Sequence, residues 1–134
     1  MPVNALRLGT FRIATPRRPG EGLRVGTVRF LPRGVAKRDY ARRDYFDVWF
    51  PTVAPSRTLV GWLKSRPWSP AVQRRYAARY RREMRAPDAA RALELLAAVA
   101  QRTPISVGCY CEDERRCHRS ILLELIRAAA RKPS

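Results

Sequence analysis

All three cysteines and the single histidine of the chain lie within ten residues of one another, from Cys109 to His118. Their spacing is Cys-x-Cys-x5-Cys-His, with Cys111 and Cys117 as the second and third thiols. Thiolates are nucleophiles and soft metal ligands, and an imidazole can act as a base or bind a metal. This segment is therefore the part of the sequence whose residue types and spacing favour chemistry.

Cys111 and Cys117 are the candidate catalytic nucleophiles, with His118 as the candidate base. We expect Cys111 to close a strand and Cys117, His118 and Arg119 to open a helix. A helix N-terminus, an imidazole and nearby arginines all favour the thiolate over the thiol. These residues predict a thiol-dependent activity if the protein is an enzyme.

The same segment also offers four soft ligands for a metal ion, namely Cys109, Cys111, Cys117 and His118. Zinc or iron is the cofactor that such a set would hold, although the spacing matches no common zinc ribbon or finger. A Cys111–Cys117 disulfide formed under mild oxidant would instead make a redox switch. Metal-binding or redox-switch proteins are thus the alternative class.

A purely structural role is the third interpretation. In it, Cys109 is a small core residue, His118 is a polar group at a helix N-terminus, and Glu112 forms a local ion pair with Arg119. The three interpretations predict reactive thiols, bound metal or neither.

The composition points to phosphate-bearing partners. The chain has 28 Lys and Arg residues against 11 Asp and Glu residues, a formal net charge of +17. Such a field attracts nucleic acid or nucleotides, because neutralising phosphates releases their counterions. Nearly all the basic residues are arginines, which a GC-rich genome also favours. A nucleic acid or nucleotide is the predicted partner.

Length and hydrophobicity indicate one folded domain over residues 1–134, with 131–134 as a flexible tail. No stretch approaches the roughly 20 apolar residues that span a bilayer. The N-terminal residues also lack the features of a secretory signal. We expect a cytoplasmic protein without a membrane partner.

Hydrophobic periodicity and turn residues predict the elements that position the cluster. Strands are expected at Ala5–Ala14, Leu23–Leu31 and Ile105–Cys111. Helices are expected after the N-caps Ser56 and Ser69, from a cap at Asp88 to Arg102, and around residues 121–129. The basic and aromatic residues 35–53 are expected to form a loop or short helix. Their aromatic rings either pack on the core, which is the preferred interpretation, or form a platform on which bases stack.

These elements predict a three-layer α/β domain in which a small, mainly parallel sheet is flanked by helices. Ligands of such sheets bind beyond the carboxyl ends of the strands. The cysteine cluster follows a strand and precedes a helix, so we expect it to line a pocket at that edge.

Several short motifs occur in an order that resembles a bacterial family, the domain-of-unknown-function family 488. They are Arg29 with Pro32-Arg33-Gly34, Trp49 with Ala54-Pro55-Ser56, Arg79-Tyr80 with Glu83-Met84, and Cys111-Glu112 with Cys117-His118-Arg119. The resemblance covers most of the chain. It implies an α/β fold with Arg29, Arg33 and the Cys/His/Arg cluster around a common pocket.

The preferred hypothesis from the sequence is a domain that binds a phosphate-bearing ligand, either nucleic acid or a nucleotide. The residues expected to bind it are Arg29, Arg33, Glu112 and Arg119. Cys111, Cys117 and His118 would then be the chemically active group beside the ligand.

Overall fold

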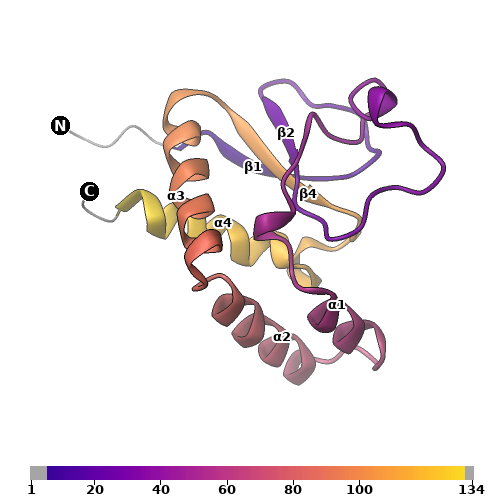
Figure 1. Ribbon diagram of the computed structural model, residues 1–134, viewed down its shortest axis with the longest axis vertical. Helices are drawn as coiled ribbons and strands as arrows, with labels where there is room; N and C mark the ends of the chain where they lie inside the picture. The colour runs from indigo at the N-terminus through magenta and orange to yellow at the C-terminus, as the bar shows by residue number, and fades with distance from the viewer. Residues whose placement is uncertain (1–5, 132–134) are drawn as a thin grey trace.

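A computed structural model of the protein describes residues 6–131. Its centre is one four-stranded sheet with the order β1-β4-β2-β3, in which every neighbouring pair is parallel (Figure 1). The strands are β1 (Leu8–Arg12), β2 (Leu23–Gly26), β3 (Val48–Trp49) and β4 (Ile105–Cys109). The sequence-based prediction of an α/β fold with a small parallel sheet is confirmed.

Within residues 6–131, four α-helices and three short 3-10 helices complete the fold. The α-helices are α1 (Arg57–Lys64), α2 (Pro70–Glu83), α3 (Pro87–Arg102) and α4 (His118–Arg131). The 3-10 helices are η1 (Lys37–Asp39), η2 (Pro51–Val53) and η3 (Glu114–Arg116). No helix among the described residues combines the length and hydrophobicity needed to cross a membrane.

One face of the sheet packs against the helices, and we call it the helix face. Side chains alternate between the two faces of a strand, so Ile105, Val107 and Cys109 of β4 share a face with the neighbouring Val25 of β2. Ile105, Val107 and Val25 belong to the main hydrophobic core, which also contains buried residues of all four α-helices.

The opposite face is covered by irregular chain, and we call it the loop face. Arg24 of β2 and Ser106 of β4 lie side by side on it. The Arg24 side chain donates hydrogen bonds to the carbonyls of Pro16 and Asp44, which lie in the covering loops. The aromatic ring of Phe46 packs directly on Gly26, where a Cβ atom would lie 2.6 Å from the ring. This third layer therefore contains loops and the η1 turn.

The sequence located the helix starts well, with one exception. Ser56 and Ser69 cap α1 and α2, because their side chains accept hydrogen bonds from the backbone N–H groups of Leu59 and Val72. Asp88 was expected to cap the next helix and does not. That helix begins one residue earlier at Pro87, whose fixed φ suits the first helical position, and Asp88 lies in its first turn.

The strands are shorter than the hydrophobic pattern predicted. The second strand ends at Gly26 rather than Leu31, and β4 ends at Cys109 rather than Cys111. The backbone N–H of Thr27 still donates to the Gly108 carbonyl, after which the chain leaves the sheet. Beyond that point Val28 is buried without forming a strand pair, whereas Phe30 is exposed.

Two segments differ from their expected forms. The short edge strand β3 lies within residues 35–53, and its Val48 and Trp49 side chains are both exposed, so it carries no hydrophobic alternation. Tyr40 and Phe46 of the same segment are buried, as predicted for core packing. At the C-terminal end, Arg131 is the last residue of α4, and residues 132–134 of the predicted tail lie outside the described residues.

Candidate functional site

The sulfur and imidazole groups meet where β4 ends and α4 begins. Cys109 is the last residue of β4, Cys117 directly precedes α4, and His118 is its first residue. The Sγ atoms of Cys109 and Cys117 are 2.6 Å apart, and Cys117 Sγ lies 3.5 Å from His118 Nδ1. All three side chains are buried. The predicted meeting of strand end, thiols and helix start is therefore present in the fold.

The hydrogen bonds of His118 determine which ring nitrogen carries the proton. Nε2 lies 2.7 Å from the backbone carbonyl oxygen of Thr27, which can only accept, so Nε2–H is the donor. The Nδ1 lone pair consequently faces Cys117. Burial lowers the pKa of His118 to about 4, so the imidazole is neutral near pH 7.

Cys111 differs from the other two cysteines because it is exposed. Its backbone N–H donates to Cys109 Sγ at 3.3 Å. Hydrogen bonds from the Cys109 and Cys117 thiols, aided by the charge of Arg119, lower the pKa of Cys111 far below its ordinary value. The pKa of Cys117 is raised, first by burial and then by its thiol neighbours. These shifts favour a thiolate on Cys111, the sulfur that solvent reaches, over one on the buried Cys117.

A cavity of about 150 Å³ opens over this cluster. Its polar lining residues are Arg29, Lys64, Tyr76 and His118, together with Cys109, Tyr110 and Cys111. Its apolar lining residues are Val28, Phe30, Pro55, Val60 and Leu63. Burial raises the pKa of Tyr76 well above its ordinary value, so the phenol stays protonated. The site is a small, mainly apolar chamber with thiols at one end.

The arginines expected at one common pocket are separated in the structure. Arg29 lines the cavity, but its guanidinium donates to the carbonyls of Ala54 at 3.2 Å and Pro55 at 3.1 Å, and so ties the β2 end to the start of α1. Arg33 is exposed and does not line the cavity. Only Arg29 of this pair lies beside the thiols.

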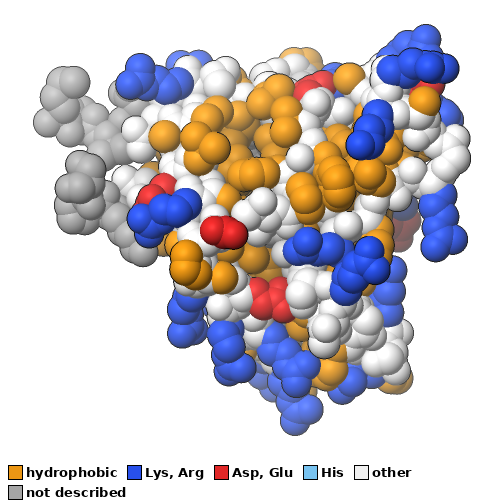
Figure 2. Space-filling model, in the orientation of Figure 1, with side chains coloured by type: hydrophobic (Ala, Val, Ile, Leu, Met, Phe, Trp, Pro, Cys, Tyr) orange, Lys and Arg blue, Asp and Glu red, His pale blue; other side chains and the backbone are white. Residues whose placement is uncertain are grey.

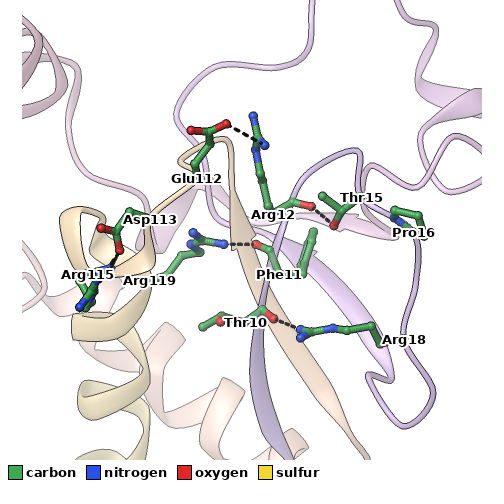
Figure 3. A pocket seen from close by; sticks show the side chains of 10 residues that line it. All are labelled: Thr10, Phe11, Arg12, Thr15, Pro16, Arg18, Glu112, Asp113, Arg115 and Arg119. Carbon is green, nitrogen blue, oxygen red and sulfur yellow. Dashed lines mark hydrogen bonds and ion pairs between the residues drawn. The ribbon is translucent and has the colours of Figure 1, made fainter.

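Arg119 lines a different pocket, of about 480 Å³, at the ends of β1 and β4 (Figure 3). The buried guanidinium donates to the carbonyls of Phe11 at 2.6 Å and Cys111 at 2.8 Å. The sequence suggested an ion pair between Glu112 and Arg119. Glu112 instead pairs with Arg12, with 3.3 Å between Glu112 Oε1 and Arg12 Nη1. Arg119 thus holds the backbone of the cysteine loop in position.

Three groups in the cluster could bind one metal ion. Ligand atoms of Cys109, Cys117 and His118 lie within 4.8 Å of one another, in a search of the described residues. The His118 Nε2–H bond to a carbonyl matches the usual support of a metal-bound imidazole, in which the other nitrogen is the ligand. Cys111 is not part of this close group, although the sequence offered it as a fourth ligand.

The sequence did not single out several residues that the fold brings to the cavity. Thr27 supplies the carbonyl that orients His118, and its hydroxyl donates to Gly108 O at 3.0 Å. Lys64 and Tyr76 arrive from α1 and α2. Thr27 directly follows a buried strand, which was a usable signal, whereas nothing in the local sequence links the two helices to the cysteines.

The chain matches the family model DUF488-N3a, described as the active DUF488-N3 subclade, over residues 8–130. The protein belongs to the DUF488 family, as the motif order predicted. No curated protein and no solved structure matches it.

Proposed function

We propose that the protein is a thiol-dependent enzyme in which Cys111 is the nucleophile. One observation carries this proposal: Cys111 is an exposed cysteine that lines the cavity beside the buried Cys109, whose sulfur accepts the Cys111 backbone N–H. A thiolate beside an apolar chamber can attack a bound electrophile while the chamber limits competing water. The family description as an active subclade also favours an enzyme.

The reaction class is nucleophilic substitution followed by hydrolysis. The Cys111 sulfur donates its electron pair to an electrophilic carbon of the ligand, and the leaving group departs with the electron pair of the broken bond. Water then displaces the sulfur, which regains its electron pair. The proton that the water loses passes to solvent or to the leaving group, so the net change is hydrolysis of one bond.

The ligand in this proposal carries phosphate, as the net charge predicted. The basic residue Lys64 lines the cavity, as does Phe30. The guanidinium carbon of Arg57 lies 5.1 Å from the centre of the Phe30 ring. The two cations would hold the phosphate while the apolar walls hold the rest of the ligand. Arg29 contributes positive charge but is already bonded to two carbonyls.

The test is the alkylation rate of each cysteine with iodoacetamide between pH 5 and pH 7, followed by peptide mass spectrometry. An ordinary thiol reacts about tenfold faster for each pH unit in this range, because its thiolate fraction rises in proportion. Cys111 should react fastest, at a rate that changes less than about twofold. Cys111→Ser should remove the fast phase. A tenfold rise per pH unit at Cys111 would refute the proposal.

Metal binding is the second candidate function, favoured by the close group formed by Cys109, Cys117 and His118. Zinc or iron would suit two thiolates and one imidazole, with Cys111 or water completing the coordination. Elemental analysis of protein purified without chelator should then give about one metal per chain. Cys117→Ser should abolish that content, and Arg33→Ala should not. Metal-free protein with three free thiols excludes this candidate.

A further inference from the structure

Nearly half of the net charge lies on α1, α2, their connection and the two residues that follow α2. Residues 57–85 contain nine Lys and Arg residues and one acidic residue, a net charge of +8 out of +17 for the whole chain. The acidic residue, Glu83, accepts hydrogen bonds from the backbone N–H and the hydroxyl of Ser56, so its carboxylate is engaged at the start of α1. Blue side chains accordingly gather over α2 at the lower end of Figure 2.

Most of these cations have no acidic partner. Four of them are exposed, and their side chains make no ion pair or hydrogen bond with the described residues: Arg74, Arg75, Arg82 and Arg85. Among the nine cations, Arg81 alone forms an ion pair within the described part of the chain, with Glu124. Unpaired cations on one surface attract a polyanion more strongly than a single small anion, because several phosphates can be neutralised together.

The same surface carries indole rings stacked with arginines. The guanidinium carbons of Arg66 and Arg79 lie 4.1 and 4.7 Å from the centre of the Trp62 ring. Arg116 lies 3.9 Å from the centre of the Trp68 ring, which is 39% exposed. Arginine planes and exposed indoles are the groups on which unpaired bases stack.

This surface adjoins the cavity. Trp68 lies in the connection between α1 and α2, and its partner Arg116 directly precedes Cys117. Lys64 of α1 lines the cavity itself. A strand bound along the surface would therefore pass the cavity entrance.

We infer that the α1–α2 surface, with Trp62 and Trp68 as its stacking groups, binds single-stranded nucleic acid and leads it to the cavity beside Cys111. The inference rests on the proposed function for the role of the cavity. It favours a strand over a free nucleotide because the cations extend along a whole helix, and over a duplex because paired bases cannot stack on the indoles.

The first experiment measures fluorescence anisotropy of a labelled 20-nucleotide single strand and of the matching duplex over a salt series. The single strand should bind at least fivefold more tightly, and its affinity should fall steeply with salt. Millimolar AMP should not displace it. Equal affinity for the duplex, displacement by AMP, or no salt-dependent binding would overturn the inference.

Variants test the surface itself. Trp68→Ala should weaken single-strand binding about fivefold or more, since base stacking on an aromatic side chain contributes about 1–3 kcal/mol. Arg66→Ala with Arg79→Ala should weaken it about tenfold. The control pair Arg7→Ala with Arg102→Ala removes the same charge just before β1 and at the last residue of α3, and should weaken binding less. Equal losses in the two double variants would overturn the inference.

Protection of Cys111 links the surface to the cavity. Saturating single strand should slow iodoacetamide labelling of Cys111 at least tenfold, and unchanged labelling would overturn the inference. Fast labelling without the strand tests the thiolate separately. Loss of strand binding with fast Cys111 labelling refutes this surface alone, whereas slow, pH-dependent labelling refutes the proposed nucleophile alone.

Discussion

The two faces of the sheet bury polar groups in contrasting ways. On the loop face, Arg24 is completely buried, yet it bonds Glu21 and the carbonyls of Pro16 and Asp44, and stacks 4.4 Å from the ring centre of Phe11. On the helix face, the buried thiols of Cys109 and Cys117 contact each other and the His118 imidazole, which itself bonds the Thr27 carbonyl. One buried cluster is saturated with strong hydrogen bonds, and the other is not.

This difference indicates a structural role for the polar cluster on the loop face and a chemical role for the cluster on the helix face. A guanidinium whose three nitrogens all donate hydrogen bonds has little left for a ligand, so the Arg24 cluster serves to hold two loops on the sheet. Thiols form weak hydrogen bonds and keep their reactivity, and on the helix face they adjoin a cavity. Substitutions on the loop face should therefore change stability, and those on the helix face should change reactivity.

The largest expected effect is that of Arg24→Met, which removes the guanidinium from the buried Glu21 carboxylate and leaves it the backbone N–H and the exposed side chain of Arg18. We expect a loss of about 3–5 kcal/mol in the free energy of unfolding, measured by urea denaturation. The double variant with Glu21→Met should recover much of this loss, because no unpaired charge remains. If the single variant were as stable as the native chain, the Arg24 cluster would not hold the loops.

The next largest effect is on the pH dependence of stability, which should differ between the titratable groups of the two faces. The pKa of His118 is about 4 in the fold and 6.5 when unperturbed, so between these values only the unfolded chain gains the proton. Stability should fall by about 2 kcal/mol from pH 7 to pH 5 through this residue. The pKa values of Glu21 and Asp47 are lowered from 4.5 and 3.8, because hydrogen bonds from Arg24 and Arg17 outweigh the effect of burial. The stability that these two carboxylates contribute is therefore lost only at lower pH.

His118→Gln provides the control for that pH effect. Its amide does not titrate. The comparison is made in a Cys111→Ser background, because the lowered pKa of Cys111 also makes stability fall as the pH drops. In that background, the unfolding free energies at pH 7 and pH 5 should differ by much less for His118→Gln than for the chain that keeps His118. An equal fall in both proteins would assign the acid sensitivity to other groups.

A matched pair of hydroxyl deletions sharpens the comparison. Thr27→Val removes the bond to Gly108 O on the helix face, and Ser106→Ala removes the 2.9 Å bond to Glu21 O on the loop face. Each should cost about 1 kcal/mol in urea denaturation. Only Thr27→Val should change the alkylation rate of Cys111, because only Thr27 contacts His118. Equal Cys111 alkylation rates in both variants would contradict the conclusion that only the helix face affects thiol reactivity.

The smallest effect should come from Glu112→Gln. Its ion pair with Arg12 joins side chains that are 81% and 46% exposed, so its removal should change the unfolding free energy by less than about 0.5 kcal/mol. Its Cys111 alkylation rate should match that of the native chain. A large loss in either measurement would give Glu112 a role that its contacts do not explain.

The pattern of the chain was enough to predict the helices and the type of sheet. Ser56 and Ser69 are local caps, and their effect needs only the next three residues. The edge strand β3 was missed because its two residues are both exposed and pair only with distant Val25 and Gly26. The predicted strand boundaries were wrong where pairing with neighbouring strands ended before the run of hydrophobic residues did.

The sequence alone determined that thiols and an imidazole would gather between a strand and a helix, because Cys109 to His118 are neighbours in the chain. It also determined the positive charge. Only the tertiary structure decided that Cys111 is exposed while Cys117 is buried, that Arg119 bonds two carbonyls, and that Lys64 reaches the cavity. Burial and hydrogen bonds between distant segments set pKa values and access, and no local pattern encodes them.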